Sequence, residues 1–320
     1  MNPVVKIDRS KKIPVYTVRK IIDDETMSTY ERRFLEEKDF KVILNTDADV
    51  YTESGELLLR FRKNVLSQTN IDNAYEAIKS LIKRKSKDRG IASGSNKGLK
   101  TGEKIGIQSN IMGYFDKWSV AQKSIFKKSG VKSPGQCRIT RFTANEPDKW
   151  EKVIPLIQDI DKCYKQLCPK EHASQYKAAL STPFHIPKTS FSTVTTNLNF
   201  RTATHHDTGD WTDGFGNLIV IERGAPYKGA HTGFPQYGVA VNCRTGDFLA
   251  MDVHQLHGNT PLIKQDETTQ RVSLVSYLRE NIVKQCKGQP MYDPVQLHKK
   301  ITRAMKRRDP KRSVTQKKKH

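Results

Sequence analysis

The sequence predicts an α+β protein whose core is an antiparallel β-sandwich or jelly roll. After Pro187 the pattern is almost entirely β, with five or more short apolar runs separated by turn sequences. The helical patterns lie together before this region and do not alternate with the strands, which disfavours a doubly wound parallel sheet. The chain has 320 residues, 36% of them hydrophobic, and is long enough to bury one large core.

Residues 1–103 are predicted to form an N-terminal α/β extension. Period-two or apolar runs predict strands, and apolar residues three and four apart predict helices. The expected strands are 14–18, 41–45 and 55–62, and the expected helices are 26–40 and 71–85. The second helix is amphipathic with a basic end, and a Gly/Ser/Lys-rich loop follows it at 90–106.

Residues 104–293 are predicted to form the β-rich core together with its helices. Strands expected at 109–116 and 136–143 precede two helices, 146–169 and 170–181, the first interrupted early by Pro155. The later strands are expected at 188–200, 216–223, 237–244, 246–252 and 270–279. The remaining residues, 294–320, are predicted to be a disordered basic tail.

The charge of the chain indicates a polyanionic partner. There are 56 Lys and Arg against 34 Asp and Glu, which gives a net charge of +22. Between Lys299 and His320 eleven Lys or Arg stand against one acid, and the run 79–90 has six cations against one acid. Nucleic acid is the usual partner of such a protein. The alternative is a solvated tail or a nuclear address.

The five cysteines and the apolar runs bear on the compartment. An odd number of cysteines without short paired spacings disfavours a disulfide framework and a Cys-rich zinc module. The N-terminal residues lack a signal-peptide pattern, and no stretch approaches membrane-spanning length. We expect a soluble intracellular protein, in the nucleus or another DNA-containing compartment, with no membrane association and no disulfide-linked partner. The oligomeric state stays open.

The segment RTATHHDTGDW, residues 201–211, contains the clearest candidate metal site. Residues two apart on a strand point the same way, so His205 and Asp207 can bind one ion while the histidine between them points elsewhere. A third donor must come from downstream. His257 is favoured because it lies in a tight turn just beyond a predicted strand; His254 and His231 are the alternatives. Two His and one Asp on one face of an octahedron form the facial triad of non-haem Fe(II) oxygenases.

The last predicted strand, TQRVSLVSYLR, adds a candidate anion site. Arg271 and Ser273 share one strand face with Val275, Tyr277 and Arg279. An arginine can bind a carboxylate through two charge-assisted hydrogen bonds, and a neighbouring serine can add a third. Together with the histidines and the aspartate, this pattern describes 2-oxoglutarate, with its keto-acid end on the metal and its far carboxylate on Arg271. A structural ion pair is the alternative for Arg271.

Three segments, 191–210, 246–261 and 270–277, resemble the TET/JBP group of Fe(II)/2-oxoglutarate dioxygenases, which hydroxylate the methyl group of pyrimidine bases in DNA. A weaker resemblance extends over 71–282. The resemblance implies a double-stranded β-helix (jelly-roll) core, Fe(II), 2-oxoglutarate and O2, and a DNA substrate. It implies that His205, Asp207 and His257 bind iron, that Arg271 holds 2-oxoglutarate, and that Arg89 lies near the co-substrate. The Cys-rich region of the animal enzymes is absent, so the chain is more similar to the compact members.

The substrate positions depart from the animal TET pattern. Asp210 stands where those enzymes have a base-contacting Asn, and Arg279 stands where they have a His. Both are predicted to contact the substrate base. A carboxylate can accept a hydrogen bond from the amino group of cytosine or the ring N–H of thymine, so 5-methylcytosine and thymine both stay open.

A base methyl group inside a duplex cannot reach a jelly-roll interior, so the nucleotide must be flipped out. Tyr227 and Phe234, in the loop between two predicted strands, are predicted to cover the flipped base, and Trp211 and Phe215 are weaker candidates. The basic helix and the loop after it are predicted to contact the DNA backbone through Lys83, Arg84, Lys85, Lys97 and Lys100.

Three other functions compete with this interpretation. The same chemistry could act on RNA or on protein side chains. The chain could also be a catalytically inactive, basic DNA-binding protein, although the sequence keeps the complete triad. A cupin-type metalloenzyme without 2-oxoglutarate would leave Arg271 and Ser273 without a purpose.

Overall fold

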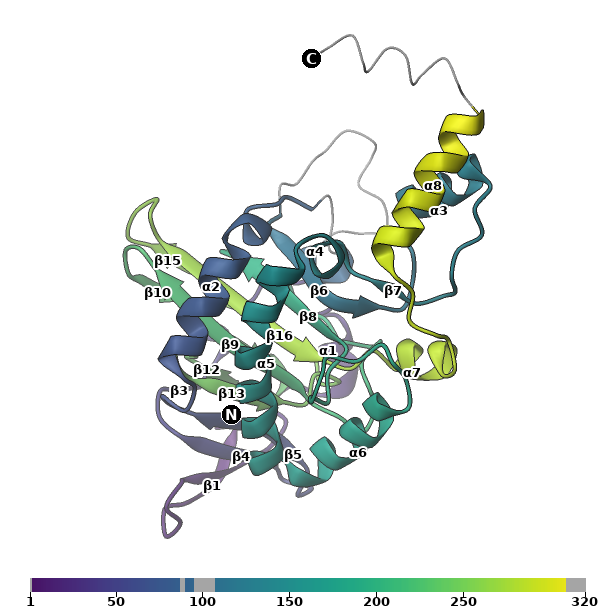
Figure 1. Cartoon of the computed structure of the whole chain (residues 1–320). Coiled ribbons are helices and arrows are strands. Elements are labelled where there is room, and N and C mark those ends of the chain that lie inside the picture. The colour runs from purple at the N-terminus through teal and green to yellow at the C-terminus, as the bar shows by residue number, and fades with distance from the viewer. Residues whose placement is uncertain (1, 87–89, 95–106, 309–320) are drawn as a thin grey trace.

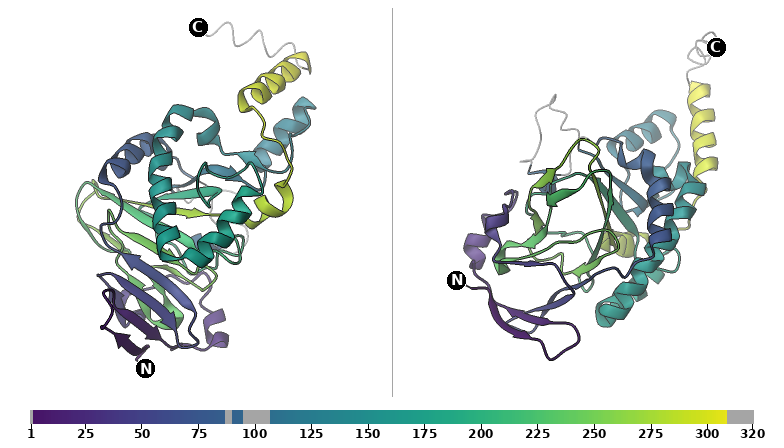
Figure 2. Two further views of the ribbon diagram at one scale, coloured as in Figure 1. Left: turned by 60° about the horizontal axis from the view of Figure 1, so that its bottom comes forward. Right: turned by 90° about the vertical axis from the view of Figure 1, so that its left-hand side faces the viewer.

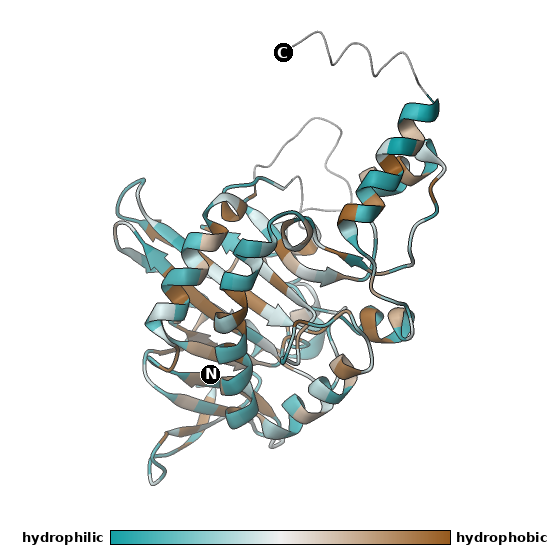
Figure 3. Cartoon of the chain, in the orientation of Figure 1, coloured by the Kyte–Doolittle hydropathy of each residue, from teal (hydrophilic) through white to brown (hydrophobic). Residues whose placement is uncertain are grey.

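The computed structural model describes residues 2–86, 90–94 and 107–308. A large, strongly twisted sheet runs through its centre, with helices on one face and a smaller sheet on the other (Figures 1 and 2). Figure 3 shows that hydrophobic residues concentrate on the strands and on the helix faces turned toward them. This arrangement is the β-rich core that the sequence predicts.

The central sheet has ten strands among the described residues, and all neighbours are antiparallel except β2 and β4. In sheet order the strands are β1 (Val4–Asp8), β2 (Val15–Val18), β4 (Ala48–Thr52), β5 (Leu57–Arg62), β13 (Phe248–Met251), β9 (Gly216–Arg223), β16 (Gln270–Tyr277), β8 (Thr193–Leu198), β6 (Ser109–Phe115) and β7 (Arg138–Ile139). Because β5 pairs with β13, the predicted N-terminal extension continues the core sheet. A domain boundary near residue 103 stays a prediction.

Two smaller sheets complete the β structure. The four-stranded sheet contains β14 (Gly258–Asn259), β11 (Thr232–Phe234), β12 (Val239–Val241) and β3 (Val42–Leu44). The two-stranded sheet pairs β10 (Tyr227–Gly229) with β15 (Leu262–Lys264).

The two faces of the central sheet bury different partners because side chains alternate along each strand. On β9, Ile219 and Ile221 join the cluster formed with the helices α2 (Gln68–Ile82) and α5 (Pro147–Leu167). Leu218 and Val220 point to the other face, toward the four-stranded sheet. The barrel interior, where the candidate site lies, is therefore enclosed between the two sheets.

The other helices are mostly peripheral. They are α1 (Asp24–Ser28), α3 (Val120–Ser129), α4 (Arg141–Asn145), α6 (Pro169–Leu180), α7 (Glu280–Cys286) and α8 (Pro294–Arg308), with 3-10 turns at Glu37–Asp39, Gly90–Ser93 and Pro235–Tyr237. α5 runs unbroken through Pro155, so the expected interruption is wrong. Within the described residues, we find no helix with the length and apolar character needed to cross a membrane.

Two local predictions fail because tertiary contacts outweigh helical or strand propensity. Residues 26–40 are not one helix. Their middle part exchanges backbone hydrogen bonds with the segment before the histidines, from Arg32 N to Thr204 O at 2.8 Å and from Thr204 N to Arg33 O at 2.9 Å. The predicted strand 136–143 is only two residues long, since α4 begins at Arg141.

The C-terminal region also differs from expectation. Residues 294–308 of the predicted disordered tail form α8, which lies beside α3 and projects from the body (Figure 1). A disulfide joins Cys137 to Cys286, which the cysteine spacing did not indicate. The bond spans 149 residues, so only the fold brings the two sulfurs together.

Candidate metal centre and co-substrate site

The candidate metal centre is assembled by backbone pairing between two distant loops. His205 and His257 form an isolated antiparallel bridge, with N–O distances of 2.9 and 3.1 Å in the two directions. Asp207 N donates to Val253 O at 3.0 Å, which fixes the third side chain against the same loop. These backbone hydrogen bonds hold the HxD segment against the turn after β13, so the side chains of His205, Asp207 and His257 meet on one side.

Both imidazoles are oriented for metal binding by their own loops. His205 Nδ1 lies 2.7 Å from Ala203 O, and His257 Nδ1 lies 3.0 Å from Gln255 O. A carbonyl can only accept, so each Nδ1 donates and each Nε2 keeps its lone pair for a metal. Burial and then the neighbouring His205 lower the pKa of His257 to about 4. His257 is therefore neutral near pH 7, as a ligand must be.

The spacing of the donor atoms fits a single ion. Asp207 Oδ1 lies 3.7 Å from His205 Nε2, and Asp207 Oδ2 lies 3.8 Å from His257 Nε2. All three donor atoms lie within 4.8 Å of one another. A metal–nitrogen bond is roughly 2 Å long, so donors less than about 4 Å apart can bind the same ion. Two imidazoles and one carboxylate suit ferrous iron and leave other positions open.

A cavity of about 200 Å³ adjoins these three side chains. Its walls come from the inward faces of β8 and β16, including Thr195, Asn197, Ser273 and Tyr277. Asn197 Nδ2 donates to Ser273 Oγ at 3.3 Å, which holds that serine in the wall. The cavity therefore joins the metal centre to the interior face of β16.

Arg271 precedes Ser273 by two residues on β16, so it lies on the same inward face, although it does not line the cavity itself. Its side chain is 3% exposed, and its Nε and Nη2 atoms have no hydrogen-bond partner among the described residues. A buried guanidinium without a partner is costly, and an anion would satisfy it. This orphaned cation fits the far carboxylate of 2-oxoglutarate. It also disfavours the alternative of a structural ion pair.

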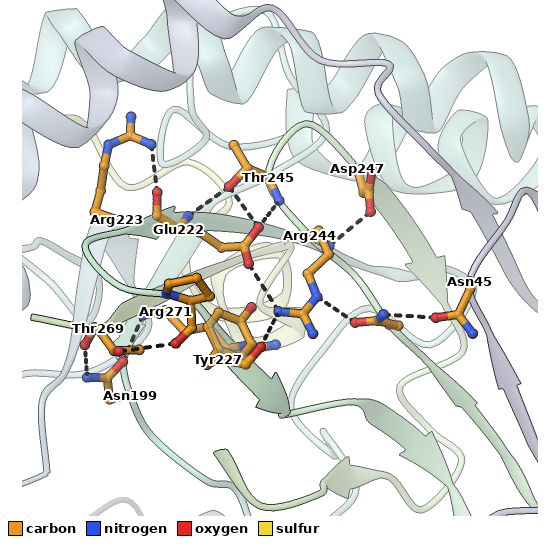
Figure 4. Close-up of polar contacts among 12 residues, drawn as sticks. Asn45, Asn199, Glu222, Arg223, Tyr227, Arg244, Thr245, Asp247, Thr269 and Arg271 are labelled. Carbon is orange, nitrogen blue, oxygen red and sulfur yellow. Dashed lines mark hydrogen bonds and ion pairs between the residues drawn. The ribbon is translucent and has the colours of Figure 1, made fainter. Parts of the chain in front are cut away.

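The start of β16 is held in place by Asn199. Its Oδ1 accepts from Arg271 N at 2.7 Å, and its Nδ2 donates to Thr269 O at 2.8 Å (Figure 4). The side chain of Arg271 is thus placed by a fixed backbone, and the sequence motifs did not single out Asn199.

Asp210 and Arg279 lie at the opposite end of the cavity, where both line its wall. Arg279 Nη2 lies 3.0 Å from Asp116 Oδ2, and its Nη1 lies 3.8 Å from Asp210 Oδ1. Burial, and then the charge of Asp207, raise the pKa of Asp210, while Arg279 opposes the shift. The structure adds Asp116 and Phe115, whose ring centroid lies 5.2 Å below the Arg279 guanidinium. Both residues lie within the weaker resemblance over 71–282, but the sequence did not single them out as site residues.

Tyr227 and Phe234 are not placed to cover a base. Phe234 is 0% exposed and packs in the core between the sheets, 6.2 Å from the His257 ring. Tyr227 is also buried, beneath Arg244, and neither residue lines the cavity. Their predicted role is corrected because the loop that carries them folds into strands β10 and β11.

The other candidates lie apart from this site or outside the described residues. His254 Nε2 lies 3.3 Å from Trp211 O. His254 and Phe215 line a separate surface pocket, to which none of the three candidate metal ligands contributes. His231 is buried in the short connection between β10 and β11 and does not join the triad. Arg84 pairs with Glu146 at 2.5 Å, next to Lys83 and Lys85. Arg89, Lys97 and Lys100 lie outside the described residues.

The family and the relatives that match this chain agree with one another. Residues 122–280 match the Tet_JBP family, described as the oxygenase domain of the 2OGFeDO superfamily. The bifunctional helicase and thymine dioxygenase JBP2 of Trypanosoma cruzi is 30% identical over 277 residues, which cover 84% of this chain and 23% of that protein. Thymine dioxygenase JBP1 of Trypanosoma brucei brucei is 34% identical over 177 residues, 55% of this chain and 19% of that protein. The chain spans less than a quarter of the length of these relatives.

Among solved structures, NgTET1 in complex with 5mC DNA has a TM-score of 0.50 and 13% identity. The match covers 80% of this chain and 86% of that chain. At this identity the likeness shows the fold, and it confirms the double-stranded β-helix class.

The fold and the metal centre define a member of the 2-oxoglutarate- and Fe(II)-dependent oxygenase superfamily. Within that superfamily the chain is a TET/JBP-like dioxygenase, as the sequence motifs predicted.

Proposed function

We propose that this protein hydroxylates the methyl group of a pyrimidine base in DNA, either 5-methylcytosine or thymine. The observation that carries the proposal is the His205–Asp207–His257 centre beside a cavity walled by β8 and β16. The inward face of β16 also bears Arg271, whose Nε and Nη2 have no hydrogen-bond partner among the described residues. Iron and 2-oxoglutarate, when bound, supply the oxidation of a C–H bond by O2. The two curated relatives compared above are named as thymine dioxygenases.

The protein groups bind, orient and exclude water in this proposal. His205, Asp207 and His257 hold the metal, and Arg271 with Ser273 holds the co-substrate. Asp210 and Arg279, at the other end of the cavity, contact the flipped base. No described group needs to act as a general acid or base, so the protein contributes a fixed geometry and an enclosed site.

The two helices α3 and α8, which pack against each other, support DNA as the substrate. α3 carries three lysines and α8 carries six Lys or Arg, and neither helix contains an acid. Two hydrogen bonds between Gln289 and the Cys137 backbone, at 3.0 and 3.1 Å, and the Cys137–Cys286 disulfide attach the base of this helix pair to the body. α3 begins five residues after Phe115, which lines the cavity. The α3–α8 helix pair is thus suited to bind phosphates beside the mouth of the site.

Mass spectrometry of nucleosides tests the proposal. Iron-loaded protein is incubated anaerobically with 2-oxoglutarate and DNA, and air then starts the reaction. One DNA contains 5-methylcytosine, and the other contains thymine as the only methylated base. A hydroxymethyl nucleoside from one of them, with matching succinate release, is expected. If succinate release is coupled to product only with RNA or peptide, the substrate is RNA or protein and the DNA proposal is wrong.

A further inference from the structure

We propose that Tyr227 is a co-substrate-binding residue, whose hydroxyl donates a hydrogen bond to the same far carboxylate of 2-oxoglutarate that Arg271 holds. This inference rests on the proposed function, because it assigns a further residue to the co-substrate of that site. It moves Tyr227 from the substrate base, where the sequence placed it, to the opposite end of the barrel.

The Tyr227 hydroxyl is buried without a partner. The residue is 8% exposed, and its OH has no hydrogen-bond partner in the described part of the chain. Leaving a buried hydroxyl without a partner is unfavourable, and buried tyrosines usually find one. Arg271 Nε and Nη2 are in the same condition. One carboxylate, which can accept several hydrogen bonds, would satisfy both side chains.

Several contacts place Tyr227 close to Arg271. Thr269 Oγ1 donates to Pro226 O at 3.3 Å, so the start of β16 lies against the residue before Tyr227. Arg271 follows Thr269 by two residues and therefore points to the same side. Burial raises the pKa of Tyr227, and the nearby charge of Arg271 opposes this shift. Figure 4 shows the two side chains gathered at this end of the barrel.

Glu222, the acidic residue opposite Arg271, is hydrogen-bonded to other groups. Glu222 is directly opposite Arg271 in the pairing of β9 with β16, so their side chains lie on the same face. However, Glu222 Oε1 accepts from Arg244 Nη1 at 3.1 Å, and its Oε2 accepts from Thr245 N at 2.9 Å (Figure 4). No ion pair joins Glu222 to Arg271 in the described residues. The charge of Arg271 is therefore kept available for an anion.

Arg244 positions the Tyr227 ring. Its guanidinium carbon lies 4.2 Å from the ring centroid, a cation–π distance. Its Nε also donates to Asn242 Oδ1 at 2.6 Å, so Arg244 is fixed on several sides. The ring is thereby fixed before the co-substrate binds, which reduces the entropy cost of binding. Arg244 acts through Tyr227 and is a positioning residue.

Calorimetric binding to the full-length, iron-loaded protein under anaerobic conditions tests the inference. The ligands are 2-oxoglutarate and pyruvate, which has the keto-acid end but no far carboxylate. Tyr227→Phe removes only the hydroxyl. A hydrogen bond to a charged group contributes about 1.5–3 kcal/mol, so the Kd for 2-oxoglutarate should rise roughly ten- to hundredfold. The Kd for pyruvate should stay unchanged.

Two further variants complete the test. Tyr237→Phe is the matched control, because Tyr237 is also buried between the sheets but its hydroxyl lies 3.4 Å from Gln255 Oε1. It should bind both ligands as the wild type does. Arg244→Gln keeps the Tyr227 hydroxyl but loses the stacked cation and frees Glu222 to pair with Arg271, so it should also weaken 2-oxoglutarate binding and leave pyruvate binding unaffected.

The outcomes separate this inference from the function on which it rests. Unchanged 2-oxoglutarate binding by Tyr227→Phe, or an equal loss for both ligands, would overturn the role of Tyr227. A wild-type protein that retains iron but does not bind 2-oxoglutarate would overturn the proposed function itself.

Discussion

His205 and His257 are 52 residues apart in the sequence, yet each accepts a backbone hydrogen bond from the other. Their ring centroids lie 4.5 Å apart. The spacing of the two imidazoles is therefore set by paired backbone, which is stiffer than a pair of long side chains. His254, three residues before His257, points instead toward the Trp211 carbonyl.

Iron retention should depend on His257 and not on His254. His257→Ala removes one of three donors and should lower the iron content from about one ion per chain to a small fraction after anaerobic loading and desalting. His254→Ala is the control and should retain iron as the wild type does. Metal analysis measures both, and the reverse result would assign the third ligand to His254.

Removal of the Arg271 charge should weaken 2-oxoglutarate binding. Arg271→Gln loses the charged partner of the far carboxylate, at a cost of about 1.5–3 kcal/mol or more, which is at least a tenfold higher Kd. Calorimetry measures the change. Arg223→Gln is the control, because Arg223 lies on the neighbouring strand but is paired with Asp72 at the surface. Wild-type affinity in Arg271→Gln would exclude the assigned role.

Replacing basic residues of α8 with neutral ones should reduce the salt dependence of DNA binding. Each lost phosphate contact lowers the slope of log K against log salt by about 0.9 for duplex DNA. The triple change Lys299→Gln, Lys300→Gln and Arg303→Gln should thus lower the slope by up to roughly 2.7. Fluorescence anisotropy at several salt concentrations gives the slope.

The matched control removes two positive charges from a part of the chain that is remote from α3 and α8. Lys11→Gln and Lys12→Gln alter the exposed turn between β1 and β2, and they should leave the slope nearly unchanged. If both sets of changes lower the slope equally per charge, the α3–α8 helix pair has no special role and only net charge matters.

Phe234 should behave as a core residue. Phe234→Ala should lower the free energy of unfolding by about 3–5 kcal/mol, because it leaves a cavity between the sheets. Phe34→Ala is the aromatic control, since Phe34 is 44% exposed, and it should cost much less. Denaturant unfolding measures both. A stable Phe234→Ala protein with weakened DNA binding would restore the original substrate role.

Part of the site is predictable from the sequence because it depends on local geometry. Alternation along β16 places Arg271 and Ser273 on one face wherever that strand lies. The same rule picked out His205 with Asp207, although β8 ends at Leu198 and the two ligands lie in the loop after it, held by backbone bonds to the segment 253–257. The same alternation cannot say what covers a face. Tyr227 and Phe234 read as loop aromatics, and their burial follows from β10 and β11 pairing with β15, β12 and β14.

The sequence by itself determined the β-rich class, the basic surface and the residue types at the metal centre, since periodicity, charge and short spacings are local properties. The tertiary structure alone decided which distant groups meet. It joined the HxD segment to the turn at His257 and brought Cys137 to Cys286. It also engaged Glu222 with Arg244, so that Arg271 has no ion pair within the part of the chain that the structure describes. These relationships arise from contacts between remote segments of the folded chain, and such contacts have no signature within any one segment.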